Sequence, residues 1–233
     1  MTHDEFLAPY ALSLRVAGVP VLLVGGGAVA QRKAVALRSS GAALTIVSPT
    51  LTPALLEWAR ARAITHVARP YEEGDIARVR PRLVFAATSD AQVNRAVARE
   101  AERHGVWVNV ASADPEGDFG RGPGTFASPA VVRRGALGIA VSTDGNSPLL
   151  ARAVREWLDE RLGQELAALA EWAGAVRRAG GGDADGAGEL LAALRSWLRG
   201  DAGPLRLVHN RAAASGAVLP NAPQPPDSGH EKH

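Results

Sequence analysis

The stretch Val21-Leu-Leu-Val-Gly-Gly-Gly-Ala-Val-Ala-Gln-Arg-Lys33 decides the fold of this chain. A short apolar run leads into three glycines and then into a helix-forming segment, which is the order of a first strand, a tight turn and a first helix in a dinucleotide-binding sheet. Gly25 permits the sharp turn, and Gly27 lets a phosphate approach the backbone. The helix start offers free N–H groups to a pyrophosphate. We therefore expect the cofactor to bind at Gly25, Gly26, Gly27, Ala28 and Val29.

A second apolar strand follows at Ala43–Ser48, at the distance that a dinucleotide-binding sheet requires. The acid that usually holds the adenosine ribose is missing from its end, where the chain has Ser48-Pro49-Thr50. We expect Ser48, Pro49 and Thr50 to take over the ribose contacts. No arginine stands there to pair with a 2′-phosphate, so the sequence favours NAD over NADP as the cofactor.

Strand and helix patterns alternate through residues 7–115. This alternation predicts an α/β fold with a Rossmann-like parallel sheet and helices on both faces. The predicted strands are 20–24, 43–48, 64–67, 82–87 and 106–110, and the predicted helices are 28–39, 52–62, 73–77 and 91–103. Ligands of such sheets bind at the carboxyl ends of the strands, so Ala87, Thr88 and Asn109 are expected near the cofactor. Asp90 is expected to cap the helix that follows it.

The second half of the chain predicts a small β unit and then helices. Residues 125–132 and 136–142 alternate around a short turn, as two antiparallel strands do, and helices are expected at 148–162, 164–178 and 186–199. We therefore divide the chain into an NAD-binding domain (1–115), a dimerisation and substrate-cleft region (116–148), a helical domain (149–205) and a disordered tail (206–233).

Composition excludes several classes of function. The chain has 233 residues, of which 46% are hydrophobic and 21% charged, as in an ordinary soluble protein. It has no cysteine, and its six histidines show no metal-ligand spacing, so no metal site is predicted. It has no secretion signal or long apolar run, which predicts a cytoplasmic protein that does not bind membranes. Its net charge is only +2, and its cations, nearly all arginine, are scattered, which argues against nucleic-acid binding.

Four motifs, in order and at the proper spacing, resemble the precorrin-2 dehydrogenase family, which includes the N-terminal half of siroheme synthases. They are the glycine turn that runs to Lys33, Ala86-Ala-Thr-Ser-Asp-Ala-Gln-Val-Asn94, Val108-Asn-Val110 with a following Asp-Pro, and Val141-Ser-Thr-Asp-Gly-Asn-Ser-Pro148. The resemblance covers about residues 7–165. It implies a homodimer that oxidises precorrin-2 to sirohydrochlorin with NAD⁺. Some members also insert Fe²⁺, and the sequence leaves that activity open here.

This chain lacks a methyltransferase half and so looks like the stand-alone form of the family. An alternative from another class is a non-catalytic module that senses NAD(H) and signals through its helices. Such a sensor would usually carry a DNA-reading or channel-gating element, and the sequence shows none. NAD⁺ binding without turnover of precorrin-2 would favour the sensor.

The resemblance also implies a catalytic base. In the family an Asp lies three residues after the Asn of the Asn-Val strand; here that position holds Ser112, and Asp114 stands two residues later. Since the substrate loses a proton as well as a hydride, a carboxylate at a strand end is the natural base, and we expect Asp114 in that role. Ser112 is the imperfect alternative and Asp118 a weaker one. Asp114 could also merely begin a turn before Pro115.

Substrate contacts are expected from two segments. Arg121 stands in a glycine-dense loop that is longer than usual for the family, and it could bind one of the eight carboxylates of the substrate. Ser112, earlier in the same stretch, is also expected to contact the substrate. The second segment, Ser142–Ser147, consists of small residues that leave room for a broad ring. A strand end followed by a helix cap would explain several of the same residues equally well. The residues expected from this second segment are Ser142, Thr143, Gly145 and Asn146.

Overall fold

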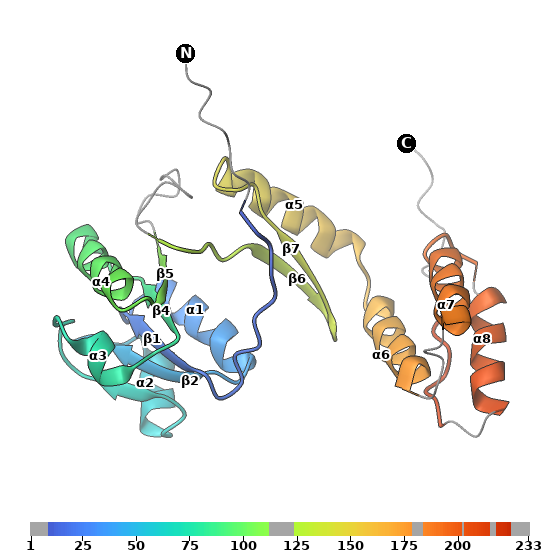
Figure 1. The fold of residues 1–233 in the computed structure, drawn as a ribbon, viewed down its shortest axis with the longest axis horizontal. Helices are drawn as coiled ribbons and strands as arrows, with labels where there is room; N and C mark the ends of the chain where they lie inside the picture. The colour runs from blue at the N-terminus through green and yellow to red at the C-terminus, as the bar shows by residue number, and fades with distance from the viewer. Residues whose placement is uncertain (1–8, 112–123, 179–183, 202, 215–217, 225–233) are drawn as a thin grey trace, which may run out of the picture. The chain divides into compact units, whose positions relative to one another are not determined.

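The computed structural model describes residues 9–111, 124–178, 184–201, 203–214 and 218–224 (Figure 1). Two compact units make up the chain. The first unit comprises the residues up to Pro129 together with Ser142–Ala151, and the second comprises Ala130–Val141 together with the residues from Arg152 onward.

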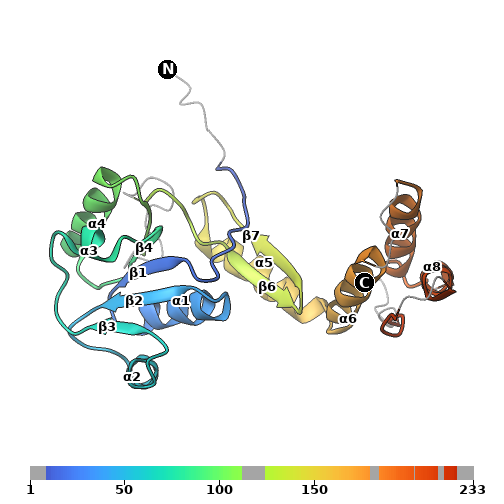
Figure 2. The same ribbon diagram turned by 60° about the horizontal axis from the view of Figure 1, so that its bottom comes forward.

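A five-stranded parallel sheet forms the centre of the first unit and confirms the predicted Rossmann-like fold. Its strands lie in the order β3-β2-β1-β4-β5, so the chain first builds outward from β1 and then returns to add β4 on the other side (Figure 2). The register aligns Val24 with both Val47 and Ala86, and Ala86 with Val110, which brings four strand ends to one edge. The strands are β1 (Pro20–Val24), β2 (Ala43–Val47), β3 (Thr65–Val67), β4 (Leu83–Ala86) and β5 (Trp107–Val110).

Four helices cover the two faces of this sheet: α1 (Ala28–Ser39), α2 (Pro53–Arg60), α3 (Asp75–Val79) and α4 (Ala91–Arg103). Alternate residues of β1 point to opposite faces. Leu23 belongs to the core that α1 and α2 cover, whereas Leu22 belongs to the core that α3 and α4 cover. A strand buried on both faces has to be apolar throughout, which explains the continuous run at the start of the glycine motif.

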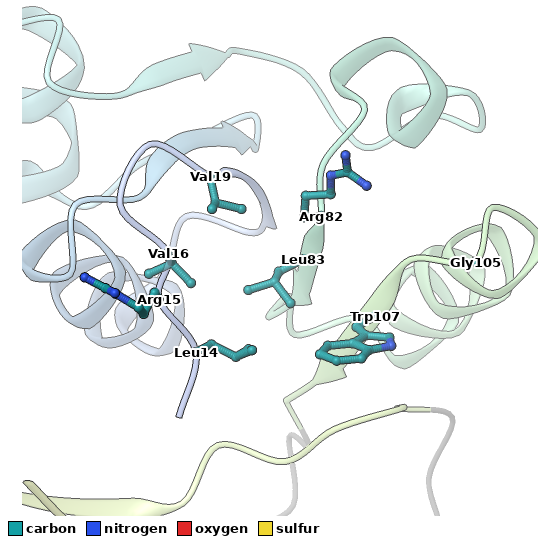
Figure 3. Close-up of a pocket in the computed structure, with 8 residues that line it drawn as sticks. All are labelled: Leu14, Arg15, Val16, Val19, Arg82, Leu83, Gly105 and Trp107. Carbon is teal, nitrogen blue, oxygen red and sulfur yellow. The ribbon is translucent and has the colours of Figure 1, made fainter. Parts of the chain in front are cut away.

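The amino-terminal ends of β1, β4 and β5 border an apolar pocket (Figure 3). Because parallel strands begin at the same edge, this pocket lies at the opposite end of the strands from the glycine turn. The residues that line it are Leu14, Arg15, Val16, Val19, Arg82, Leu83, Gly105 and Trp107.

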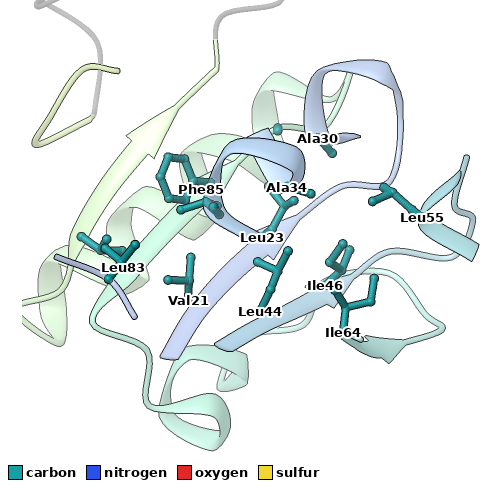
Figure 4. Packing of buried hydrophobic residues seen from close by; sticks show 13 residues of the cluster. Val21, Leu23, Ala30, Ala34, Leu44, Ile46, Leu55, Ile64, Leu83 and Phe85 are labelled. Atoms are coloured by element: carbon teal, nitrogen blue, oxygen red, sulfur yellow. The ribbon is translucent and has the colours of Figure 1, made fainter. Parts of the chain in front are cut away.

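Packing on the α1 face is dense because α1 presents small residues to the sheet. Ala30 and Ala34 are fully buried and lie above Leu23, which lets the helix approach closely (Figure 4). Ala30 occupies the third position of the glycine pattern, where a small residue is required for this contact.

Buried carboxylates stabilise the other face of the sheet. Asp75, at the start of α3, accepts hydrogen bonds from Arg69 (2.6 Å) and Arg78 (2.6 Å). Glu100 of α4 accepts from the backbone N–H groups of Gly74 (3.0 Å) and Ile76 (3.1 Å) and from the Tyr71 hydroxyl. These bonds fix the short helix α3 to α4 through polar contacts.

The second unit contains an antiparallel hairpin, β6 (Ala130–Arg134) and β7 (Leu137–Val141). Four helices accompany it: α5 (Pro148–Arg161, which begins in the first unit), α6 (Glu165–Arg178), α7 (Ala184–Trp197) and α8 (Gly203–Ala214). Arg134, at the end of β6, donates to the backbone carbonyls of Asp159 (2.6 Å) and Leu162 (2.7 Å) and to the Asp159 carboxylate (2.9 Å). The hairpin is thereby fixed to the end of α5.

Two tryptophans form the centre of the helical core in the second unit. Trp172 and Trp197 are fully buried, and each indole N–H has a partner: His209 Nδ1 at 3.1 Å for Trp172 and the Pro223 carbonyl at 3.1 Å for Trp197. Both serve as core residues, whereas Trp157 is 52% exposed and lies under the Arg161 guanidinium.

Two predictions for this half are wrong in part. The predicted disordered tail from residue 206 contains most of α8 and a segment at 218–224 that packs through Leu219 on the tryptophan core. The first hairpin strand begins at Ala130 and not at 125, because the N–H of Thr125 donates to Val108 of β5 (2.8 Å). Among the described residues, no helix combines the length and apolar composition that a membrane span requires.

Candidate functional site

The glycine turn between β1 and α1 lies against the ends of both neighbouring strands. Gly25 has φ +115°, and a Cβ there would lie 2.8 Å from the Ala87 carbonyl carbon. A Cβ at Gly26 would collide with the Thr50 carbonyl and lie 2.8 Å from Ser48 Oγ. The fold itself therefore requires these two glycines, and their close contacts bring the ends of β2 and β4 up to the turn.

Gly27 is different, because neither conformation nor packing in the described part of the chain demands a glycine there. Its φ is −82°, and a Cβ would meet nothing within 4 Å. The space beside Gly27 is therefore open to a ligand. A phosphate group fits this space because it approaches the backbone most closely where no side chain intervenes.

The start of α1 supports the same interpretation. The Thr52 side chain caps α2 and the Asp90 side chain caps α4, the latter as predicted, whereas no side chain caps α1 and its first turn holds no acidic residue. The first N–H groups of a helix need acceptors and carry a partial positive charge. The Gly27–Val29 backbone thus fits the pyrophosphate of a dinucleotide.

The end of β2 is shaped by hydrogen bonds of its own residues. Ser48 is buried, and its hydroxyl donates to the Thr50 carbonyl (2.8 Å). It therefore shapes the turn, and its proton is not available to a ribose hydroxyl. Pro49 and Thr50 are exposed at the rim, where a ribose could reach them. His66 of β3, which was not predicted for the site, lies with Nε2 2.9 Å from the Ser48 carbonyl oxygen.

The end of β4 is held by Asn94 of α4. The Asn94 side chain accepts from the Thr88 N–H (3.1 Å) and hydroxyl (2.8 Å) and donates to the Thr88 carbonyl (3.0 Å). Asn94 is 3% exposed, so this clamp lies inside the protein. It fixes the backbone that follows Ala87, which is the backbone that faces Gly25.

At the end of β5, Asn109 lies between two partners from distant segments. Its side-chain oxygen accepts from Lys33 Nζ (2.6 Å), and its side-chain nitrogen donates to the Phe126 carbonyl (2.9 Å). The Lys33 ammonium also lies 5.2 Å from the centre of the Phe85 ring. Burial, and secondly the charge of Arg32, lower the pKa of Lys33 to about 8.

Lys33 and Asn94 were not predicted as site residues because their partners appear only in the folded chain. Lys33 stands 76 residues before Asn109 in sequence. One signal was available: Lys33 and Lys232 are the only lysines among 26 basic residues.

The segment Ser142–Ser147 forms a hydrogen-bonded turn in the first unit. The Thr143 hydroxyl donates to the Ser147 carbonyl (2.8 Å), and the Ser142 hydroxyl lies 3.1 Å from an Asp144 carboxylate oxygen. Asp144 and Gly145 have positive φ, and Asn146 is exposed. These contacts give the turn a structural role, which the sequence also allowed.

The structure thus brings all of the predicted cofactor residues to one edge of the sheet. This carboxyl edge comprises Gly25–Val29, Ser48–Thr50, Ala87–Thr88 and Asn109, with Lys33 beneath Asn109. Three predicted site residues, Ser112, Asp114 and Arg121, lie outside the described residues. Within the described ranges, no group of three His, Asp or Glu side chains could hold a metal ion.

Comparison with known proteins adds two family matches. Residues 12–122 match a family described as "Putative NAD(P)-binding", and residues 134–161 match one described as "Sirohaem biosynthesis protein central". The first match contains the whole carboxyl edge of the sheet, and the second contains β7 and all of α5.

Two curated relatives and one solved structure are also similar to this chain. "Siroheme synthase 1" of Aeromonas salmonicida is 40% identical over 163 residues, which are 70% of this chain and 33% of the relative. "Siroheme synthase" of Gluconacetobacter diazotrophicus is 38% identical over 170 residues, which are 72% of this chain and 35% of the relative. The chain thus spans about a third of the length of these relatives.

The solved structure titled "SirC, precorrin-2 dehydrogenase" has a TM-score of 0.71 and 24% identity, and the match covers 88% of this chain and 100% of that one. This likeness bears out the fold. The two family matches and the relatives lead to one conclusion: this chain belongs to the family of precorrin-2 dehydrogenases and the N-terminal part of siroheme synthases.

Proposed function

We propose that this chain is an NAD-dependent precorrin-2 dehydrogenase, which converts precorrin-2 to sirohydrochlorin in siroheme biosynthesis. The observation that carries the proposal is the open space at Gly27 beside the uncapped start of α1. The relatives named siroheme synthase and the structural neighbour named precorrin-2 dehydrogenase support the choice of substrate.

Each part of the carboxyl edge has a role in this proposal. The backbone of Gly27, Ala28 and Val29 binds the pyrophosphate. Pro49 and Thr50 border the adenosine ribose. The end of β2 has neither the acid that would favour NAD strongly nor the arginine that would favour NADP. NAD is our choice because no cation stands at that strand end for a 2′-phosphate.

The chemistry needs a hydride acceptor and a proton acceptor. Bound NAD⁺ supplies the hydride acceptor. We assign the proton to the carboxylate of Asp114, four residues after the end of β5, with Ser112 as the alternative. The Asn94 clamp and the Lys33–Asn109 bond hold the ends of β4 and β5 rigid, so that coenzyme and substrate can be kept in contact.

Substrate binding and assembly complete the proposal. Arg121 is assigned to a substrate carboxylate, and Ser142, Thr143, Gly145 and Asn146 are assigned to the border of the tetrapyrrole. We also propose a homodimer formed through the second unit. The support is a two-stranded sheet whose Val131 is 41% exposed, together with the half-exposed Trp157 of α5, since exposed apolar residues of this kind mark interaction surfaces.

An anaerobic assay tests the reaction. Purified protein, NAD⁺ and precorrin-2 are mixed, and formation of NADH is followed by its near-ultraviolet absorbance. We expect turnover in the unaltered protein and a loss of about 100-fold or more in Asp114→Ala, because a general base contributes at least that much. NAD⁺ affinity, measured by calorimetry, should stay unchanged in the variant.

Asp118→Ala is the comparison variant, because Asp118 is the weaker candidate for the base in the same stretch of sequence; with Asp114 as the base it should keep its activity. Full activity in Asp114→Ala would remove the assignment of the base. NAD⁺ binding without any turnover in the unaltered protein would favour the NAD(H)-sensing module. The same preparation, given Fe²⁺ and sirohydrochlorin, tests whether iron insertion accompanies the dehydrogenation.

A further inference from the structure

Lys33 is a cation without a carboxylate partner in the described part of the chain. Its ammonium is half-buried between α1 and the sheet, where it donates to a neutral amide oxygen, Asn109 Oδ1, at 2.6 Å. The ion pairs among the described residues are formed by arginines. A half-buried charge with no counter-charge among the described residues keeps part of its field, because no partner neutralises it and the protein on its buried side screens it less than bulk water would.

The position of this charge follows from the fold. In a sheet of this kind the adenosine ribose binds at the end of β2 and the pyrophosphate at the start of α1. The other half of the dinucleotide must then extend across β1 toward the ends of β4 and β5. Asn109 is the penultimate residue of β5, so Lys33 stands beneath the part of the edge that faces the nicotinamide half.

We propose that the Lys33 ammonium makes the dinucleotide site prefer the reduced over the oxidised coenzyme, by fixing one positive charge beside the carboxyl end of β5. The proposal rests on the dinucleotide binding proposed above and adds the residue that distinguishes the two oxidation states.

The direction of the effect is set by charge. The nicotinamide ring carries a positive charge when oxidised and none when reduced, while the rest of the coenzyme is the same. A fixed cation nearby therefore disfavours the oxidised ring and favours its conversion to the reduced one. One unit charge within about 10 Å, at an effective dielectric constant of about 20, changes such an equilibrium by roughly tenfold. This bias favours hydride transfer to the coenzyme.

Because the Lys33 amine titrates, the proposal can be tested by changing the pH. The pKa of Lys33 is lowered to about 8 by burial and by Arg32, so the amine loses its charge within an accessible pH range. Among the described residues, the elements packed against it present Phe85, Asn109 and Phe126, none of which titrates. Arg32 of its own helix stays charged throughout. An arginine at this position could not be switched in the same way.

The experiment measures the dissociation constants of NAD⁺ and NADH by calorimetry between pH 7 and pH 9. For the unaltered protein we expect the ratio of the NAD⁺ constant to the NADH constant to fall by about fivefold between pH 7 and pH 9, because the amine loses most of the charge that repels the oxidised ring. In Lys33→Met the ratio should stay flat near the high-pH value, and in Lys33→Arg it should stay flat near the low-pH value.

Arg32→Gln is the matched control. It removes a neighbouring, exposed charge from the same helix and should keep the pH dependence, with its midpoint moved upward because one cause of the lowered pKa is gone. A flat ratio in the unaltered protein, or an unchanged pH dependence in Lys33→Met, would overturn the inference while coenzyme binding stands. If the unaltered protein binds neither coenzyme at millimolar concentration, the proposed function falls, and this inference with it.

Discussion

At the scale of single residues, the three glycines of the first turn have different roles: two are required by the fold, and one leaves space for a ligand. Gly27 has open space where a Cβ would stand, whereas a Cβ at Gly25 would collide with the Ala87 backbone. We expect Gly27→Ala to change the free energy of unfolding by about 1 kcal/mol or less. The added methyl should crowd a phosphate and weaken NAD⁺ binding by about tenfold or more. Urea unfolding and calorimetry measure the two effects.

Gly25→Ala is the contrasting variant. It forces an L side chain into φ +115° and against backbone, so it should cost about 2 kcal/mol or more of stability. If Gly27→Ala binds NAD⁺ as tightly as the unaltered protein, the space beside Gly27 is not where the pyrophosphate lies.

A second residue-scale prediction concerns Asp75, the buried first residue of α3. Burial alone would raise the pKa of this carboxyl, but hydrogen bonds from Arg69, from the Glu72 N–H and from Arg78 outweigh burial and lower the pKa below its ordinary value of 3.8. Its charged form therefore stabilises the fold above about pH 4, and that contribution is lost as pH falls through the lowered pKa. Asp75→Asn should cost about 2 kcal/mol at pH 7.

Urea unfolding at pH 7 and at successively lower pH checks this prediction, since the difference between Asp75→Asn and the unaltered protein should shrink in acid. Glu72→Gln is the control from the same cluster. Its side chain is 57% exposed and lies 3.7 Å from Arg69, so its loss should cost little at any pH. An acid-independent difference for Asp75→Asn would show that the charge of Asp75 is not what stabilises α3.

At the scale of helices and strands, the sequence predicted the α/β half well because each element carries its own local signal. The continuous apolar runs of β1 and β4 are bounded by turn residues, and Asp90 marks the start of α4. The misplaced start of β6 has a non-local cause. Residues 125–126 alternate like a strand, but their backbone bonds go to Val108, which no local pattern reveals.

The missed helix α8 has a different cause. Gly203 and Pro204 look like a chain break, and the next residues mix arginine, histidine and asparagine with alanine, so the helical period is weak. Proline is tolerated in the first turn of a helix, and α8 begins at that pair. The helix is stabilised by its packing on α7 and by the Trp172–His209 hydrogen bond, neither of which the local sequence reveals.

The candidate site follows the same division between local and distant signals. The glycine turn and the strand ends could be located from sequence because they recur at fixed spacing in this type of sheet. The Asn94 clamp and the Lys33–Asn109 bond could not, since each depends on which side chains the finished fold brings together. The finding that Ser48 Oγ is already bonded likewise required the structure.

At the scale of the whole molecule, the proposed homodimer gives a direct prediction. The double variant Val131→Glu with Trp157→Glu places two charges on exposed apolar positions of the second unit. If that surface forms the dimer interface, light scattering after size-exclusion chromatography should report the mass of two chains for the unaltered protein and of one chain for the variant.

Val35→Glu serves as the control for this experiment. Val35 is 46% exposed on α1, in the first unit, so its substitution introduces a charge outside the unit that is proposed to form the interface and should leave the mass unchanged. A dimer that survives both charges in the double variant would place the interface elsewhere.

The bond from the Trp197 indole to the Pro223 carbonyl has a practical consequence for shortening this protein. Residues 218–224 look dispensable in a sequence view, yet they cover the indole and accept its only N–H. A chain cut before Leu219 would remove that acceptor and the packing of Leu219 and Ala222 on the tryptophan core. Protein engineers who trim the molecule should therefore keep this proline-rich segment.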